Sequence, residues 1–218
     1  MAGLVIPAEA ETDEMPETAA ATVSVGSGKV LAGGTITVPI SISGNPGFTN
    51  FAVSFTFDPE KLILVSIQTG EGEEAYLCGN RVSTNTQWQL TETGSCGFVV
   101  AASANTVDGN GCLFTATFQA RDNLTQDVVV TPRVHYLRCN GNPAAEVVVQ
   151  NGTISTIVPG DLTGDGVVEY DDVMMAYRAA KGLDELTEDQ ILAADQNGDS
   201  KIDDTEVDEL YGIYTGGQ

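Results

Sequence analysis

The amino-acid sequence predicts a two-domain protein of mixed class, in which an all-β sandwich of jelly-roll type at residues 22–157 precedes a small α domain at residues 158–218. Two patterns support this division. Apolar and polar residues alternate with a period of two in the first part, whereas the second part contains two acidic twelve-residue loops that each run into a helical pattern. A chain of 218 residues is long enough for two small domains.

The strand pattern is clearest at Thr35–Ser43, where every second residue from Ile36 is apolar. Pro39 inside this run lacks an amide donor, which places the strand at a sheet edge or at a β-bulge. Phe51–Phe57 alternates in the same way, and a turn at residues 58–61 leads to a more apolar strand at Leu62–Ile67. The predicted inward-facing residues of the two alternating strands are Ile36, Val38, Ile40, Ile42, Phe51, Val53, Phe55 and Phe57.

Further strand-like runs are separated by clusters of Gly, Asn and Asp, and none has helical periodicity. They span residues 86–90, 97–102, 112–120, 128–137 and 147–157. Eight or nine short strands between residues 22 and 157 are typical of a β-sandwich with one core between two sheets.

Composition excludes several classes of partner. The formal net charge is −22 and the chain has only nine Lys and Arg residues, so we expect no nucleic-acid binding. No run of eighteen apolar residues exists, so we expect no membrane span. Residues 158–218 hold 16 acidic and 3 basic side chains, a charge density typical of a cation-binding module.

The first 21 residues have the composition of a leader. A short apolar stretch ends in Ala8-Glu9-Ala10, a small-x-small cleavage pattern, and residues 11–21 are polar, acidic and aperiodic. We interpret residues 1–21 as a signal remnant followed by a disordered leader, and therefore expect a secreted, extracellular protein. An ordinary unstructured terminus is the alternative interpretation.

Four cysteines lie in the first domain, without CxxC spacing and with only one histidine in the chain, which argues against a zinc site. Because the number is even and we expect export, disulfides are the main interpretation, and free buried thiols stay open. Three connectivities are possible among Cys78, Cys96, Cys112 and Cys139.

Fragments of the first domain carry a family resemblance. They are Gly26–Gly34, Thr35–Ile40, Pro46–Val53, Phe57–Leu62 and Val149–Ile154. In their order and spacing they resemble cohesin modules, the receptor domains of cellulosome scaffoldins. The resemblance implies a sheet face that binds a dockerin module and that here displays Asn50, Ala52 and Ser54. Ala52 stands where the best-known cohesin type carries Asp, so the partner specificity of that type is not carried over.

Other functions of the first domain have weaker support. The single histidine, His135, has no Ser or Cys partner placed by a motif, so we interpret it as structural and expect no enzyme. Trp88 is the only tryptophan, whereas sugar-stacking surfaces usually present several aromatic rings. A carbohydrate-binding sandwich stays open as an alternative.

The acidic loops begin at Asp161 and, 34 residues later, at Asp195. Calcium takes six to eight oxygen ligands, which a twelve-residue loop supplies from positions 1, 3, 5, 7, 9 and 12 around a sharp turn at position 6. The spacing therefore predicts two calcium ions. The predicted ligands are Asp161, Thr163, Asp165, the carbonyl of Val167, Glu169 and Asp172 in the first loop, and Asp195, Asn197, Asp199, the carbonyl of Lys201, Asp203 and Glu206 in the second.

The sharp turn differs between the loops. Gly166 occupies it in the first loop and Ser200 in the second, and a positive φ at Ser200 is expected to cost about 1 kcal/mol relative to Gly. Helices are predicted at residues 170–181 and 204–214, with a short helix at 191–194 after a cap at residues 187–190, and none before the first loop.

A duplicated loop-helix unit that lacks the entering helix resembles the dockerin module, with its paired F-hand-type calcium loops. The resemblance implies that loop positions 10 and 11 and helix positions 17, 18 and 22 contact the partner. These are Tyr170, Asp171, Tyr177, Arg178 and Gly182 in the first unit, and Asp204, Thr205, Tyr211, Gly212 and Gly216 in the second. Because only the tyrosines and the final glycines match between the units, we expect one dominant binding orientation. Packing of both tyrosines against the calcium loops is the alternative.

A cohesin followed directly by a dockerin resembles a non-catalytic adaptor scaffoldin of a bacterial cellulosome. Residues 158–218 are then expected to dock onto a cohesin of a larger scaffoldin, while residues 22–157 recruit dockerin-bearing enzymes or other proteins. Two alternatives stay open: a carbohydrate-binding sandwich attached through a dockerin, and a dockerin that binds its own cohesin. The short joint at Pro159 makes the second of these sterically awkward.

Overall fold

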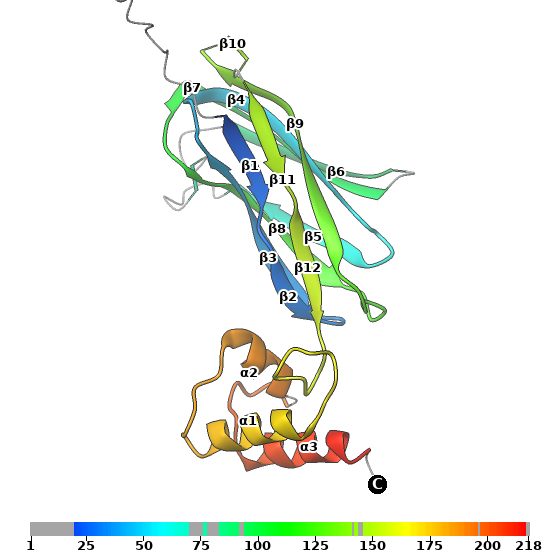
Figure 1. The fold of residues 1–218 in the computed structure, drawn as a ribbon. Coiled ribbons are helices and arrows are strands. Elements are labelled where there is room, and N and C mark those ends of the chain that lie inside the picture. Colours follow the sequence, from blue (N-terminus) through cyan, green and yellow to red (C-terminus); the bar gives the residue numbers. More distant parts are fainter. Residues whose placement is uncertain are drawn as a thin grey trace, which may run out of the picture.

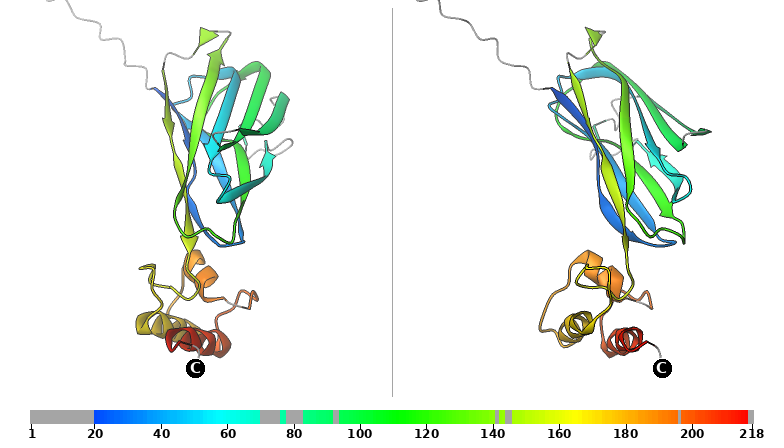
Figure 2. Two further views of the ribbon diagram at one scale, coloured as in Figure 1. Left: turned by 90° about the vertical axis from the view of Figure 1, so that its right-hand side faces the viewer. Right: turned by 45° about the vertical axis from the view of Figure 1, so that its right-hand side comes forward.

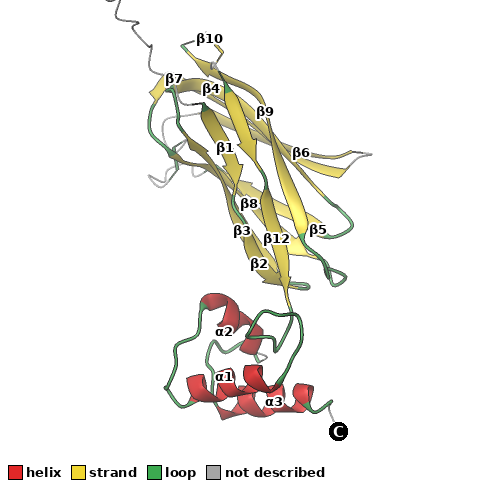
Figure 3. Ribbon diagram, in the orientation of Figure 1, coloured by secondary structure: helices red, strands yellow, loops and turns green. Residues whose placement is uncertain are grey.

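The computed structural model describes residues 20–69, 76–77, 83–91, 94–140, 142–143, 146–195 and 197–216, of which residues 83–91, 94–98 and 100 are described by their backbone alone. In this part of the chain the strands come first and three helices follow (Figures 1 and 3). The strands are β1 (Ala21–Val25), β2 (Gly28–Leu31), β3 (Thr35–Ser43), β4 (Phe48–Phe57), β5 (Leu62–Gln68), β6 (Ser83–Thr91), β7 (Gly94–Val107), β8 (Gly111–Ala120), β9 (Val128–Cys139), β10 (Asn142–Pro143), β11 (Val147–Gln150) and β12 (Gly152–Ile157). The helices are α1 (Tyr170–Ala180), α2 (Glu188–Ala194) and α3 (Asp204–Tyr214). The expected signal remnant and leader lie outside the described residues, apart from its last two alanines.

The strands form the predicted two-sheet sandwich. One sheet has the order β11-β1-β3-β8-β5 and the other β2-β12-β9-β4-β7-β6, with β10 paired to β9. Phenylalanines of β4 and β8 join the two sheets through the core, since the Phe55 ring lies 5.9 Å from that of Phe118. The four inward-facing residues predicted in Phe51–Phe57 are confirmed as buried, whereas Ala52 and Ser54 between them are buried as well.

The position of Pro39 differs in part from the prediction. Its strand β3 lies inside the sheet, between β1 and β8, and is therefore not an edge strand. Pro39 is tolerated because the pairing of β3 with β1 covers only residues 40–43 and so does not include Pro39, whose carbonyl accepts a hydrogen bond from the Gly26 amide at 2.7 Å. A Cβ at Gly26 would lie only 2.6 Å from Pro39 Cδ, so this close approach requires glycine. The predicted bulge is present one residue on, as a register shift between Ile40 and Ser41.

The strand predicted at residues 147–157 is two strands that belong to different sheets. β11 pairs in parallel with β1, whereas β12 pairs with β2 and with the first residues of β9. The chain crosses between the sheets at Asn151. After this crossing, the last half of β9 lies beside β11 (Figure 1). In the described part of the chain these two strands are not paired with each other.

The cysteines do not form the expected framework. Cys112 and Cys139 are free thiols, and each of the three possible connectivities requires both of them, so the prediction of two disulfides is wrong. Burial raises the pKa of each of these two thiols. The side chains of Cys78 and Cys96 lie outside the described residues.

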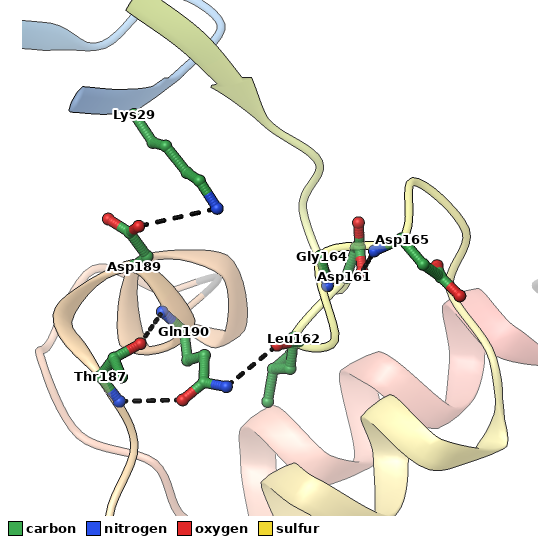
Figure 4. Close-up of polar contacts among 8 residues, drawn as sticks. All are labelled: Lys29, Asp161, Leu162, Gly164, Asp165, Thr187, Asp189 and Gln190. Carbon is green, nitrogen blue, oxygen red and sulfur yellow. Dashed lines mark hydrogen bonds and ion pairs between the residues drawn. The ribbon is translucent and has the colours of Figure 1, made fainter. Parts of the chain in front are cut away.

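The helical part has its own apolar cluster and sits on one end of the sandwich (Figure 2). Leu31 of β2 and Ile157 of β12 belong to this second cluster, so the sandwich contributes directly to it. Lys29 Nζ lies 3.8 Å from a carboxylate oxygen of Asp189, and the Gln190 side-chain amide donates to the Leu162 carbonyl (Figure 4). Helix α2 is thereby fixed between the sandwich and the first acidic loop. Among the described helices none is long and apolar enough to cross a membrane.

Candidate metal loops and interaction faces

The first carboxylate of each acidic loop is the centre around which that loop folds. Asp161 Oδ1 accepts hydrogen bonds from the amides of Gly164 and Asp165 (Figure 4), and its Oδ2 accepts one from the amide of Gly166. The same bonds recur 34 residues later, where Asp195 accepts from the amides of residues 198, 199 and 200. The two loops therefore have one backbone geometry, as the repeat in the sequence predicts.

The last carboxylate of each loop starts the helix that follows. Asp172 and Glu206 are both fully buried. Each accepts a hydrogen bond from the amide of its helix N-cap, Glu169 at 2.7 Å and Asp203 at 2.9 Å. Loop and helix are thus joined in a capping box, which accounts for the confirmed starts of α1 and α3.

The second loop fits a hard divalent cation. Carboxylate oxygens of Asp195, Asp199 and Glu206 all lie within 4.8 Å of one another, which is unfavourable unless a cation or protons compensate their charge. Asn197 donates its side-chain amide to Glu206, and its Oδ1 accepts a hydrogen bond from the Asp199 amide at 2.9 Å. The Thr205 amide, bonded to Asp203, holds the pKa of that carboxyl below its usual range.

The first loop has the same donor chemistry in a looser arrangement. Its acidic residues are all described, yet they do not come together as the three carboxylates of the second loop do. Asp172 Oδ1 accepts from the amides of Leu162 and Thr163, both at 2.8 Å. The Asp165 side chain points away from Asp161 (Figure 4). The remaining predicted ligands are exposed at the loop surfaces; they are Thr163, Val167, Glu169, Lys201 and Asp203.

Backbone conformation at the sharp turns follows the prediction. Gly166 has φ = 93°, and Ser200, its counterpart, has φ = 62°. Ser200 is therefore a non-glycine residue in the left-handed region, where its Cβ carries a steric cost.

Helices α1 and α3 lie side by side in opposite directions (Figure 2). At one end of the pair, Tyr170 and Tyr211 each contact Tyr214, with ring centroids 6.4 and 6.3 Å apart. Tyr170 and Tyr211 are 55% and 54% exposed, so they are surface residues. We call these three residues the tyrosine end. Sequence reasoning missed Tyr214, because the residue 34 positions before it is Ala180 and no repeat marks it.

The opposite end of the pair is charged. Lys181 Nζ lies 2.5 Å from Asp204 Oδ1, and this bond raises the pKa of Lys181. The same Nζ atom lies over the ring of Tyr177. Arg178 binds the Asp184 carboxylate through Nε and Nη2, which raises the pKa of Arg178 and lowers that of Asp184. Tyr177 is 43% exposed, and Asp171 and Thr205 are exposed too, so the predicted contact residues of both units lie on the surface.

The predicted face of β4 is less open than expected. Ala52 and Ser54 are only 1% and 4% exposed, so their prediction as displayed residues is wrong. At a register shift of β9 opposite Ala52 and Val53, His135 Nε2 lies 2.9 Å from Ser54 Oγ, so His135 contributes to the burial of Ser54. His135 thus has a serine partner, which no sequence motif indicated. Asn50 is half-buried, and its Oδ1 has no hydrogen-bond donor within the described structure.

The outer face of β9 is basic where it passes β4. Arg133 lies opposite Ser54, and Arg138 lies opposite Asn50 with its guanidinium 5.6 Å from the centre of the Tyr136 ring. Sequence reasoning did not select these residues, because their position beside β4 depends on strand order. The side chain of Trp88 lies outside the described residues.

Comparison with known proteins identifies the family of the sandwich. Residues 21–158 match the family model described as the cohesin domain. The chain belongs to the cohesin domain family. Cohesin domains are non-catalytic protein-interaction domains. A search of curated proteins found no match.

Solved cohesin structures share this fold. The third cohesin ScaC of Acetivibrio cellulolyticus, solved in complex with the ScaB dockerin, is 20% identical, with a TM-score of 0.51 over 63% of this chain and 99% of its own. A non-cellulosomal cohesin from the hyperthermophilic archaeon Archaeoglobus fulgidus is 23% identical, with a TM-score of 0.52 over 64% of this chain and 92% of its own. These similarities establish the fold of the cohesin domain, and they do not extend to the helical part.

Proposed function

We propose that the protein is a non-catalytic adaptor scaffoldin. Its cohesin domain recruits dockerin-bearing proteins, and its helical part, residues 158–218, is a dockerin that docks onto the cohesin of a larger scaffoldin. The observation that carries the proposal is the duplicated loop-helix unit behind a cohesin domain, with the hydrogen bonds of Asp161 repeated by Asp195. The setting that fits best is an extracellular cellulosome.

Calcium is the cation that the two loops suit best, since all their predicted donors are oxygen atoms. When bound, calcium would neutralise the loop carboxylates and stabilise the folded helical part, because a ligand of the folded state shifts the folding equilibrium. The buried carboxylates of Asp172 and Glu206 are predicted ligands that also belong to the capping boxes of α1 and α3. Binding of calcium would therefore stabilise the start of each helix as well as its loop.

One dominant docking orientation follows from the different ends of the α1–α3 pair. A dockerin that binds in two orientations needs the two ends to look alike. Here one end presents three tyrosines and the other an ion pair between Lys181 and Asp204. Exposed tyrosines supply large contact area at low cost in conformational entropy, so the tyrosine end is the better candidate for the main contact.

The docking roles are tested by probing an array of cohesins and dockerins with the full chain. We expect capture by at least one cohesin and by at least one dockerin. Replacing two second-loop carboxylates (D199N/E206Q) should abolish capture by the cohesin and leave capture by the dockerin unchanged. D208N, which removes an exposed acid of α3 outside the loops, is the matched control.

The receptor role is tested on the same array. N50R on β4 should abolish capture by the dockerin and spare capture by the cohesin, whereas T37R, an exposed residue of the other sheet, should change neither. A chain that no cohesin captures in calcium would contradict the adaptor proposal. Retention on cellulose or xylan without capture by any dockerin would support a carbohydrate-binding sandwich in its place.

The orientation is tested with paired substitutions. We expect Y170A/D171A, at the tyrosine end, and D204A/T205A, at the charged end, to differ in their loss of affinity for the captured cohesin by at least tenfold. If each pair leaves affinity intact and only their combination fails, the two orientations are interchangeable.

A further inference from the structure

A surface groove of about 570 Å³ lies where the two sheets of the cohesin domain separate. Residues 132–138 of β9 form one wall, Val147 and Val149 of β11 form the other, and Pro143 of β10 closes one end. β12 pairs with β9 only at residues 128–130, and β10 only at residues 138–139. Between these points no described strand pairs with this side of β9, so the groove has the length and the open edge that suit an extended segment.

The groove is basic in a strongly acidic protein. Arg133, Arg138 and the single histidine of the chain all lie on its β9 wall, although the whole chain has only nine Lys and Arg residues against 31 Asp and Glu. The opposite wall is apolar, because Val147 and Val149 line it. A suitable occupant is therefore an extended peptide that carries carboxylates along one side.

The chain itself contains such a segment a few residues before β1. Residues 11–17, here called the acidic segment, hold four carboxylates in seven positions: Glu11, Asp13, Glu14 and Glu17. The described chain begins just after it, and Ala21 pairs with Val147 at the start of the apolar wall. The start of β1 lies at the same end of the sandwich as β10, which closes the groove (Figure 1).

Chain lengths agree with this placement. Seven extended residues span roughly 23 Å, the same as the seven residues of the β9 wall. To reach the groove from β1 the chain must pass over β11, a distance of two strand spacings or roughly 10 Å, which residues 18–20 can cover.

We propose that this groove binds the chain's own acidic segment, with carboxylates of residues 11–17 facing Arg133 and Arg138. Because only residues 18–20 separate the segment from β1, its effective concentration at the groove is of millimolar order, so a dissociation constant of about 1 mM for the untethered segment is enough to hold it there. The bound segment shields the open side of β9 from pairing with other chains.

The experiment compares backbone amide chemical shifts of the full chain with those of E11Q/D13N/E14Q/E17Q, in calcium and at low salt. We expect amides of residues 133–138 and 147–149 to shift between the two proteins. The difference should vanish in 0.5 M salt, where the screening length falls to roughly 4 Å. R133Q/R138Q should show the same shifts as the neutralised segment, whereas R121Q, outside the groove, should behave like the unmodified chain.

Several outcomes would overturn the proposal. Identical groove shifts in the unmodified and neutralised chains at low salt would show that the segment does not bind. A difference that grows with protein concentration would assign the groove to the segment of a second copy. If an acidic oligosaccharide such as oligogalacturonate moves the groove amides while the neutralised chain shows no change, the groove is a carbohydrate site. Because neither residues 11–17 nor the groove enters the docking test above, the two proposals fail independently.

Discussion

Ser200 shows how one residue separates two otherwise repeated loops. Both loops need a positive φ at their sharp turn, but only the first meets it with glycine. Ser200 is exposed, so its conformation is imposed by the hydrogen bonds of the loop to Asp195 and not by packing. The second loop thus gathers its carboxylates more closely while holding a strained turn.

S200G is therefore expected to raise the free energy of unfolding of the helical part by about 0.5–1 kcal/mol in calcium. The reverse substitution G166S should lower it by about 1 kcal/mol, and a side chain at Gly166 would meet no atom within 4 Å, so the effect isolates backbone strain. Thermal melts followed by helical circular dichroism measure both. Changes of the same sign in the two variants would contradict the interpretation.

The thiols of Cys112 and Cys139 are predicted to react slowly with alkylating agents. Burial raises the pKa of both thiols because it disfavours the thiolate, so less of the reactive thiolate is present at neutral pH than in an exposed cysteine. Iodoacetamide should modify both without prior reduction, more slowly than it modifies an exposed cysteine, and the rate should rise as the pH is raised. Mass spectrometry of the unreduced protein measures this, and recovery of either cysteine in a disulfide would contradict it.

At the scale of elements, short-range patterns predicted more than long-range ones. Alternation in Thr35–Ser43 and Phe51–Phe57 fixes which side chains face the core, because a strand has a period of two wherever it lies in a sheet. The start of α2 was predicted within a few residues, since the Thr187–Gln190 capping box is local, although α2 begins at Glu188 and not at Ile191.

Features that depend on neighbouring elements were not predictable in this way. The contact of His135 with Ser54 depends on a register shift between β4 and β9, and the split between β11 and β12 follows from their pairing with different sheets. Tyr214 joins the tyrosine end only because α3 runs opposite to α1. The calcium ligands and partner contacts remain predictions at this scale.

The tyrosine end gives a prediction for helix α3. Y214A should lower the affinity for the captured cohesin at least tenfold, because an exposed aromatic side chain at the centre of a contact contributes about 2 kcal/mol or more. Y177A, at the charged end, should change the affinity less than twofold. Calorimetric titration measures both values. Equal losses from the two substitutions would show that both ends of the helix pair contact the partner.

The whole molecule is joined by a shared apolar cluster. Leu31 and Ile157 extend from the sandwich into the helical part, and the Gly160 amide donates to the Ala193 carbonyl at 2.8 Å. Because α2 leads directly into the second loop, the order of that loop and the order of the joint depend on the same helix.

Chelation of calcium should therefore affect the helical part and the joint together while sparing the sandwich. Eight predicted ligand carboxylates lie between residues 161 and 206, and without a cation their repulsion opposes the folded loops. We expect helical circular dichroism to fall and the radius of gyration from X-ray scattering to rise, because a disordered helical part no longer packs on Leu31 and Ile157. The β-sheet signal and its melting temperature should stay unchanged.

L31A in calcium separates the two effects: it should loosen the joint while the helices persist. An unchanged helical signal after chelation would contradict a role of calcium in folding this part of the chain.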